Sequence, residues 1–458
     1  MHKSLQNEIE KMRPHNENLP ETADLFRSQL DQIINMEHEL VELAKTIDWS
    51  YLDERNSEFY STEGRPGVPS RLIIGLHILK YMFNLSDEGV CERWVYDPYF
   101  QFFCGEKYFQ HEFKMDRTSM THWRHRVGDK FCETLLQESL YSAFKLGAIE
   151  IKDVERVAVD TTVQPKAITH PTDAKLYHKA IQALGKLAKQ HAVPLRQSYA
   201  RVSKQLAIKV GRYRHAKQMK RANKAQRKLK TYLGRIIRDI NRKIAGIEQL
   251  NQVFLLSLDK AKRLFTQEKH SKDKLYSWHA PEVECISKGK AHKPYEFGCK
   301  VSMMTNINAA PAGHFVLHTA ALHGNPYDGH TLKPMMEAMH TFTGIEPKRI
   351  YVDKGYQGHE YPKKLRVFKS GQKRGVTAAI KRELKRRSVI EPIIGHVKHE
   401  HRLDRNYLLG VLGDKMNALL AAVGYNFRLI LKWLRDLLWF IFCWLFTSLD
   451  QPHLQAIS

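Results

Sequence analysis

One segment of the chain, residues 209–243, combines a strong positive charge with an apolar seam. It holds fourteen Lys or Arg side chains against a single acid, Asp239. From its second half onward, apolar residues recur at steps of three and four, which predicts an amphipathic helix with a packed seam and a basic outer face. Such a face repels itself unless an anion neutralises it. The fold must therefore accommodate a long helical section that presents this charge outward.

The charge of the whole chain points the same way. The 458 residues carry a formal net charge of +24. A globular protein this basic usually has an anionic partner, for which nucleic acid is the first candidate and an anionic membrane surface the competitor. Within the basic segment, the residues expected to contact DNA are Lys217, Lys220, Arg221 and Lys224.

Other features predict a chain that works in the cytoplasm. The six cysteines are scattered without a C-x-x-C pair, which is typical of free thiols in a reducing compartment. The first residues contain no apolar stretch of the secretory type. The apolar run at residues 437–446 is too short to span a bilayer, so we predict a buried or partner-facing helix there and no membrane partner.

Residues 1–150 are expected to form a helical domain. Apolar residues recur near helical spacing from about residue 21 to 146, and Ser70 is a candidate N-cap for "RLIIGLHILKYMF". Further helices are predicted at 86–94 and 118–144. Short helices with tight connections in a basic protein fit a helix-turn-helix type of DNA binder, and a plain helical bundle fits equally well.

The pattern changes at Glu155. The stretch "ERVAVDTTVQ" is short and β-branched, which predicts a strand. A mostly helical basic insertion follows at 173–280. Then "YEFGCKVSMMT" and "HFVLHTAAL" predict a hairpin, "PYDGHTLKPMMEAMHTF" a helix, "KRIYVDKGYQG" a strand and "GVTAAI" a last short strand. We therefore predict an α/β domain over residues 151–405 and C-terminal helices over 406–458.

Three acids lie at informative places in this order. Asp160 is in the first strand, Asp353 ends the fourth, and Glu391 begins the last helix. The first and fourth strands of such a sheet can be neighbours, and the helix can bring Glu391 beside them. Converging carboxylates need a cation, and Mg²⁺ prefers hard oxygen ligands of this kind. Two such ions about 3.5–4 Å apart would support in-line displacement at phosphorus.

Cations surround Glu391. On an ideal helix Arg387 lies about 40° from Glu391, and Lys398 and Arg402 each lie about 20° from it, so these residues are expected to share a face and bind phosphates. The alternatives stay open at this point. Ser388 and Glu391 also fit a capping box, and Pro392 fits a helix that starts at Glu391.

Other structural readings apply to the neighbouring residues. Asp353 fits a turn residue, and Asp328 and Glu400 fit surface or capping groups. The three histidines of "HVKHEH" suggest zinc but have no cysteine partners.

Together these blocks resemble a known family. "GRPGVPSRLIIGLHILKYMFNLSDEGVCERWVYDPYFQFFCG" and "THWRHRVG" are similar to the N-terminal domain of insertion-sequence-5-type transposases, within the wider insertion-sequence-4-like superfamily. "VAVDTTVQPKAITHPTDAKL", "YVDKGYQG" and "RSVIEPIIGHVK" resemble the three acid-bearing blocks of their DDE domain, and "LGDKMNALLAAVGYNFR" their C-terminal helix. In the superfamily signature Tyr-x2-Arg-x3-Glu-x6-Lys, Arg387, Glu391 and Lys398 fit, and Leu384 replaces the tyrosine.

The resemblance implies a ribonuclease-H-like, retroviral-integrase-like catalytic fold in which Asp160, Asp353 and Glu391 bind two Mg²⁺ ions, with Mn²⁺ as a substitute. It implies a transposase that binds terminal inverted repeats, cleaves there and joins the 3′-hydroxyl ends to target DNA. It further implies a homodimer or larger assembly on DNA, in a prokaryotic cytoplasm near the nucleoid. The rivals are a nuclease of the same fold that cuts without joining, and a non-catalytic DNA-binding protein.

Overall fold

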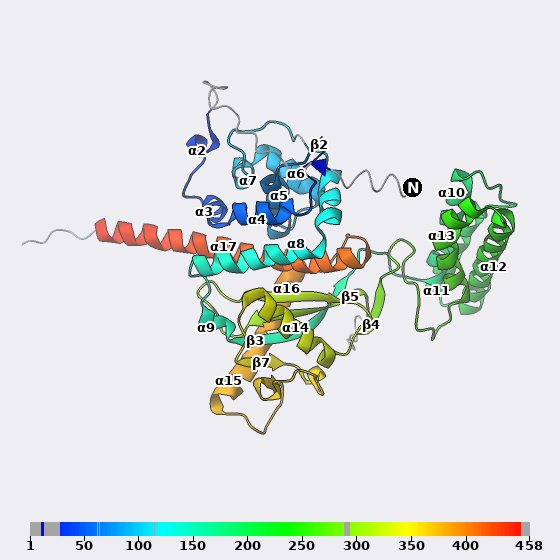
Figure 1. Cartoon of the computed structure of the whole chain (residues 1–458). Helices are drawn as coiled ribbons and strands as arrows, with labels where there is room; N and C mark the ends of the chain where they lie inside the picture. The colour runs from blue at the N-terminus through cyan, green and yellow to red at the C-terminus, as the bar shows by residue number, and fades with distance from the viewer. Residues whose placement is uncertain are drawn as a thin grey trace, which may run out of the picture. The chain divides into compact units, whose positions relative to one another are not determined.

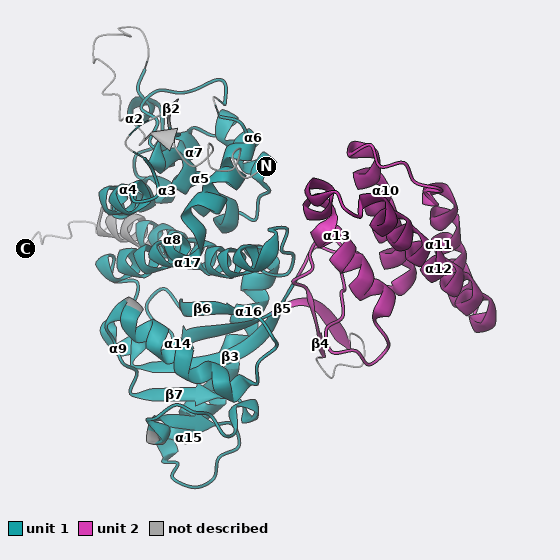
Figure 2. Ribbon diagram, turned by 45° about the vertical axis from the view of Figure 1, so that its right-hand side comes forward, with its two compact units in different colours: residues 1–165, 300–458 teal, residues 166–299 magenta. Residues whose placement is uncertain are grey.

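The computed structural model describes residues 11–12, 28–61, 63, 65–113, 115–287 and 294–449. The chain divides into two compact units, residues 1–165 with 300–458 and residues 166–299 (Figure 2). The predicted domain borders at 150 and 405 fall within the first unit and stay a prediction about smaller domains there.

The N-terminal part of the first unit is helical in its described residues, as predicted. Two short strands, β1 (Lys11–Met12) and β2 (Arg65–Pro66), pair in parallel. Helix α5 begins at Ser70 with Pro69 as its N-cap, one residue before the predicted cap, whereas Ser86 caps α6 through a hydrogen bond accepted from the Gly89 N–H at 2.9 Å. The helices are α2 (Leu30–Ile33), α3 (Glu39–Thr46), α4 (Trp49–Ser57), α5 (Ser70–Met82), α6 (Asp87–Tyr96), α7 (Pro98–Phe103), α8 (Thr118–Lys145) and α9 (Ile151–Val154).

The last helix, α17 (Gly410–Leu449), links these helices to the sheet. It packs against α3, α5 and α8 on one side and against strand β6 (Val316–Leu322) on the other (Figure 1). Gly424 permits the close crossing with α5, since a Cβ there would lie 2.5 Å from the backbone carbonyl carbon of Tyr81. The side chain of Asn417 joins the two parts directly: it accepts from the Tyr81 hydroxyl and donates to Gln164 of the sheet, each at 2.9 Å.

The sheet of the first unit has the order β6-β5-β3-β7-β8. Strands β5 and β6 are antiparallel, which confirms the predicted hairpin, and β3, β7 and β8 run parallel. Helix α14 (Asp328–Thr343) connects β6 to β7 and packs against β6. The remaining strands are β3 (Arg156–Pro165), β5 (Tyr295–Asn306), β7 (Arg349–Val352) and β8 (Val367–Lys369).

The prediction of a strand at "GVTAAI" was wrong. Thr377 instead caps α15 (Ala378–Arg386), where its hydroxyl accepts from the Ile380 N–H at 3.4 Å. Ile380 and Glu383, three residues apart, are both buried, which is a helical rather than a strand spacing. The fifth strand of the sheet is β8, a segment of only three residues.

The second unit contains four helices and strand β4 (Glu284–Ser287), which pairs with the start of β5. The basic segment is not one helix but parts of two, because Lys217 has a left-handed backbone (φ 56°) between α11 and α12, and α12 ends at Ile244. Its predicted apolar seam is confirmed in part: Ile236, Ile240, Ile244 and Phe254 are buried in a common core. Leu250 is only partly buried against that core, and Ile247 is 46% exposed because it lies in the turn between α12 and α13. The helices are α10 (Asp173–Gln190), α11 (Ala200–His215), α12 (Met219–Ile244) and α13 (Glu248–Thr266).

The apolar run at 437–446 is helical, as predicted, because α17 extends through it. The prediction that this run packs against something concerns mainly the side chains of residues 440–446, which lie outside the described residues. Among the residues that the structure describes, no helix is both long enough and apolar enough to cross a membrane.

Candidate active site

Two of the predicted acids, Asp160 and Asp353, follow directly on the paired segment of two neighbouring parallel strands. The pairing of β3 with β7 ends at Val159 and Val352. Asp160 is the next residue within β3, and Asp353 is the first residue after β7. Residues 157–159 of β3 and 350–352 of β7 are all fully buried, so both faces of the two strands lie in the core up to the point where the acids follow. The expectation that the first and fourth strands are neighbours is confirmed.

The third acid, Glu391, lies at the start of α16 (Ile390–Glu400). A short 3₁₀ turn, η3 (Arg387–Val389), joins this helix to α15 without a break, so Arg387 and Glu391 lie one helical turn apart. Pro392 is the third residue of α16, where an N–H has no partner within its own helix. Ser388 does not cap the helix: its hydroxyl donates to the Lys385 carbonyl at 3.2 Å, and α16 has no side-chain cap. The capping-box alternative for Glu391 is therefore wrong.

All three carboxylates surround one guanidinium group. The Arg387 Nη1 lies 3.5 Å from the Asp160 Oδ2, and its Nη2 lies 3.7 Å from the Asp353 Oδ1 and 3.6 Å from the Glu391 Oε1. The Arg387 side chain is only 11% exposed, whereas those of Asp353 and Glu391 are 51% and 64% exposed. The site is thus a cluster of oxygen donors around a buried cation, with two donors open to solvent.

This donor set fits a divalent metal of the hard kind. Mg²⁺ binds carboxylate oxygens, usually one or two per ion, and keeps waters and substrate phosphates as its other ligands. Asp160 is also held in place, because its Oδ1 accepts from the Thr161 N–H at 2.8 Å. The arrangement offers one fixed and two accessible carboxylates, each within 3.5–3.7 Å of the same guanidinium group.

A fourth acid, Asp328, lies beside this cluster and was not expected there. As the first residue of α14, its Oδ1 accepts from the Thr161 hydroxyl and pairs with the Lys300 Nζ, both at 3.0 Å. Its other oxygen leaves little space beside Gly355, since a Cβ on that glycine would lie 3.0 Å from it. Asp328 therefore touches the residue after Asp160 and packs close to the turn after Asp353. An acid at the start of a helix is typical of a capping group, so no sequence pattern indicated that Asp328 lies beside the three predicted acids.

The hydroxyl of Tyr356 is a buried group that the negative charges of this cluster affect. It lies in the 3₁₀ turn η1 (Lys354–Tyr356) and is 1% exposed. Burial raises the pKa of its hydroxyl, and the negative charges of Asp160 and Asp328 raise this pKa further. The two carboxylates therefore act on one buried group from β3 and α14.

Lys398 and Arg402, which were both predicted to share a helix face with Glu391, do not lie on one common face. Lys398 is half-buried on α16, two turns after Glu391, in keeping with a shared face. Arg402 does not share that face, because α16 ends at Glu400 and Arg402 has a left-handed backbone (φ 68°). Its guanidinium instead donates to the Asn84 carbonyl of the N-terminal helices at 3.2 Å.

The leucine that replaces the tyrosine of the superfamily signature has a packing role. Leu384, on α15, packs against an apolar cluster that includes Tyr351 and Phe368 of the sheet. This side chain therefore helps to dock α15 on the sheet. The neighbouring Glu383 strengthens the same contact through its ion pair with Arg349 at 2.8 Å.

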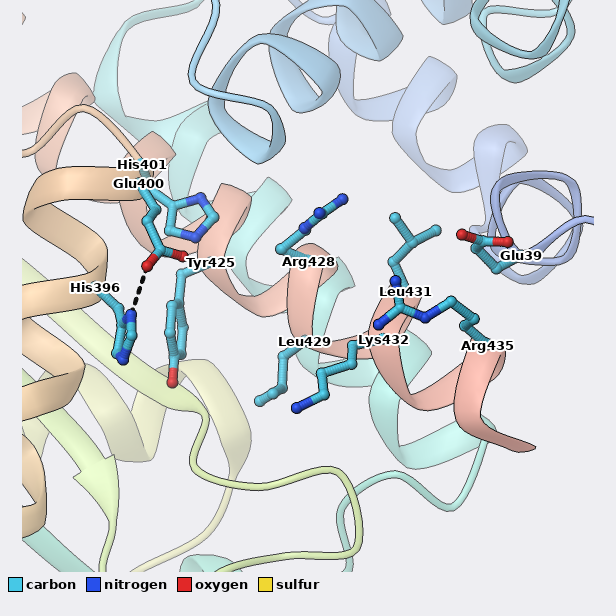
Figure 3. Close-up of a pocket in the computed structure, with 10 residues that line it drawn as sticks. All are labelled: Glu39, His396, Glu400, His401, Tyr425, Arg428, Leu429, Leu431, Lys432 and Arg435. Carbon is cyan, nitrogen blue, oxygen red and sulfur yellow. Dashed lines mark hydrogen bonds and ion pairs between the residues drawn. The ribbon is translucent and has the colours of Figure 1, made fainter. Parts of the chain in front are cut away.

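The three histidines after Glu391 do not converge on a common point. His396 pairs with Glu400 at 2.6 Å, and His399 lies 3.6 Å from Asp404 (Figure 3 shows the first pair). His401 lies 2.9 Å from the Tyr81 carbonyl through its Nδ1, and burial lowers its pKa to about 4. These separate partners give no support to the zinc alternative.

A hollow of about 290 Å³ lies at the C-terminal end of α16. Figure 3 shows basic side chains of α17 along it. These side chains are Arg428, Lys432 and Arg435. They follow one another at steps of four and three residues, so they share one face of the helix.

The four basic residues predicted to contact DNA lie in the second unit. Lys217 is in the turn between α11 and α12, and the others lie on the first turns of α12. All four side chains are exposed, so the structure leaves them available to a partner. The set is Lys217, Lys220, Arg221 and Lys224.

Comparisons with known proteins identify the family of the chain. Residues 28–126 match the family described as "Transposase domain (DUF772)", and residues 264–427 match "Transposase DDE domain". A protein of Rhizobium meliloti described as "Uncharacterized protein ORF8 in nfe locus" is 52% identical over 195 residues, which are 43% of this chain and 94% of that protein. No solved structure matches the chain.

The second family match contains Asp353 and Glu391, and the first covers most of the described N-terminal helices. The chain belongs to the DDE transposases, as its sequence blocks predicted. Proteins of this family are enzymes that act on DNA, and they generally use divalent metal ions.

Proposed function

We propose that this protein binds the terminal inverted repeats of a transposon, cleaves the DNA at those ends and joins the freed 3′-hydroxyl ends to target DNA. The observation that carries the proposal is the convergence of Asp160, Asp353 and Glu391 on one guanidinium group. Three acids from β3, the end of β7 and α16 have no need to meet for folding. Their meeting supports a site for cations and phosphates.

The strand order supports a ribonuclease-H-like catalytic fold. Numbered along the chain from β3, and leaving out β4, the five strands lie across the sheet in the order 3-2-1-4-5. The first strand pairs in parallel with the fourth, and the second and third form an antiparallel hairpin. In the proposed fold this order brings the first and fourth strands together at the centre, where Asp160 and Asp353 lie.

In this proposal Asp160, Asp353 and Glu391 hold two Mg²⁺ ions, for which Mn²⁺ can substitute. The ions would supply charge stabilisation at phosphorus and activation of the attacking oxygen. Asp160, fixed by the Thr161 N–H, sets the position of the site, and the more exposed Asp353 and Glu391 are free to adjust to a substrate. Arg387 keeps the three carboxylates together against their mutual repulsion, and it lies within reach of a phosphate bound there.

The remaining parts are assigned by charge and position. The N-terminal helices recognise the terminal repeat, Lys398 positions phosphates beside the scissile one, and the exposed lysines of α12 bind DNA without regard to sequence. Arg402, whose guanidinium donates to the Asn84 carbonyl, stays in the proposal as a DNA contact because of its positive charge. A homodimer or larger assembly on DNA remains part of the proposal, as does a place beside the nucleoid of a prokaryotic cytoplasm.

The test is a cleavage and joining assay. A labelled duplex carrying the inverted repeats that flank the gene is incubated with the protein, Mg²⁺ and a target plasmid. We expect cuts at the repeat ends and joined products. Cuts without joined products at any metal concentration would favour a nuclease, and binding without cuts would favour a non-catalytic DNA-binding protein.

A further inference from the structure

A second basic site lies in the second unit, away from the predicted DNA-contact lysines. A hollow of about 750 Å³ opens beside the C-terminal half of α12. Guanidinium groups from one face of this helix and from the loop before α11 line it. These are Arg196, Arg235, Arg238 and Arg242.

The single acid in this hollow is already neutralised by its own neighbours. The Asp239 carboxylate is 10% exposed, accepts from the Arg196 backbone N–H at 2.8 Å, and pairs with Arg242 at 3.2 Å and Lys243 at 3.3 Å. In the described part of the chain, no carboxylate lies within ion-pair distance of Arg235 or Arg238. Both of these side chains are exposed, so the hollow presents excess positive charge to solvent.

An aromatic pair forms one wall of the site. The Tyr199 ring lines the hollow and stacks on the Tyr232 ring, with centroids 4.3 Å apart and planes 16° apart. The Tyr199 hydroxyl accepts from the Arg235 Nη1 at 3.3 Å. The ring is therefore fixed on one side by another ring and at its tip by a guanidinium group.

The backbone at Tyr199 is strained. Its φ of 52° is left-handed, a conformation that is unfavourable for a bulky side chain and that clusters at binding sites. The residue is also the N-cap of α11 but makes no side-chain cap there. Its ring is partly buried against the apolar core of the second unit, so packing holds the side chain in place while part of it stays open to the hollow.

We propose that this hollow binds a strand of DNA with unpaired bases: the arginines contact successive phosphates, and a base stacks on Tyr199. A cationic groove with an aromatic platform is the general recognition mode for single strands, because every base has a π-face. DNA that is being cut and rejoined carries unpaired nucleotides beside the breaks. The inference deepens the proposed function by naming the DNA species, and its binding test requires no cleavage.

The experiment measures binding of a fluorescent twelve-nucleotide oligo(dT) and of a duplex of equal length to the full chain. We expect Tyr199→Asn, which suits the left-handed backbone, to weaken oligo(dT) binding about tenfold, since stacking contributes about 1–3 kcal/mol per base. Duplex affinity should change less than twofold. Tyr199→Phe keeps the ring and should bind like the parent.

The phosphate contacts have a matched control. Arg235→Gln with Arg238→Gln should weaken oligo(dT) binding at least tenfold. Arg212→Gln with Arg221→Gln removes the same charge from exposed positions outside the hollow and should weaken duplex and oligo(dT) binding alike. Equal losses of duplex and oligo(dT) binding in the hollow variants, or no loss in either, would overturn the inference.

Thermal melts show whether each variant is folded, and Asp353→Asn separates the two proposals. That variant should lose cleavage while keeping oligo(dT) affinity. If the parent protein never cleaves but binds oligo(dT) through Tyr199, the proposed function fails and the single-strand site stands.

Discussion

Glu391→Gln is the sharpest test of the active site, because the structure predicts a small effect on stability and a large effect on catalysis. The substitution keeps the size of the side chain and removes its charge. Glu391 is 64% exposed, caps no helix and pairs with Arg387 at 3.6 Å. An exposed pair of this kind contributes about 0.2–1 kcal/mol. The melting temperature should therefore fall by no more than about 2–4 °C.

Catalysis should respond far more strongly. A carboxylate that binds metal loses most of its affinity as an amide, and removal of one preorganised electrostatic group typically costs about a hundredfold to a thousandfold in rate. We expect a loss of at least that size in end cleavage, with end binding retained in a gel-shift assay. Mn²⁺ should restore part of the activity, since it generally binds a given site more tightly than Mg²⁺ and is less demanding of geometry.

The same helix offers a matched control. Glu400, at the other end of α16, is 58% exposed and pairs with His396. Glu400→Gln makes the same chemical change outside the cluster and should leave cleavage near the parental rate. If Glu391→Gln also cuts and joins at the parental rate and melts like the parent, Glu391 is not a metal ligand and the reasoning about the site is refuted.

Three further outcomes are expected. Asp328→Asn keeps the acceptor for Thr161 but loses the charge that pairs with Lys300, so the Mg²⁺ concentration for half-maximal cleavage should rise roughly tenfold to a hundredfold; an unchanged titration would make Asp328 structural only. Replacing the four predicted DNA-contact residues of α12 and its preceding turn by Gln should flatten the salt dependence of duplex binding by a log–log slope of roughly 0.9 for each lost phosphate contact, and an unchanged slope would show that this face does not touch DNA. Burial lowers the pKa of His401 from 6.5 to about 4, so between these pH values the unfolded chain binds a proton there that the folded chain does not. The free energy of unfolding should therefore fall as the pH drops from about 6.5 to about 4. Denaturant titrations should show a shallower fall in His401→Gln, and identical curves for the two proteins would contradict this assignment.

Local patterns predicted most elements of the sheet and the helix that follows it. Alternating and β-branched runs predicted β3, β5, β6 and β7, and the register of the buried valines then placed Asp160 next to Asp353. The short apolar stretch at β8 was too brief to stand out, and Thr377 capped a helix where a strand had been expected. Whether three residues form a strand, or whether a threonine caps a helix, depends on contacts with other parts of the fold, which cannot be read from a single sequence.

Some features of the candidate site could likewise be predicted from the sequence, and others could not. The acids were recognisable because each lies at the end or in the middle of a patterned element. The contacts of Asp328 were not, because they depend on Lys300 and Thr161, which are distant in sequence and belong to other strands. The turn at Lys217 was also missed, since a positive φ at a lysine leaves no trace in the hydrophobic periodicity.

The position of α17 sets an order for folding during synthesis. The N-terminal helices emerge from the ribosome well before α17, the helix that completes their core through Tyr81 and Gly424. Until then the apolar faces of α5 and α8 lack their main partner and are open to association with other chains. A chain that stops before residue 410 would therefore be left without a finished core in its N-terminal helices as well as without the Asn417 contact to the sheet. Premature termination should yield material for chaperones and proteases rather than a stable fragment.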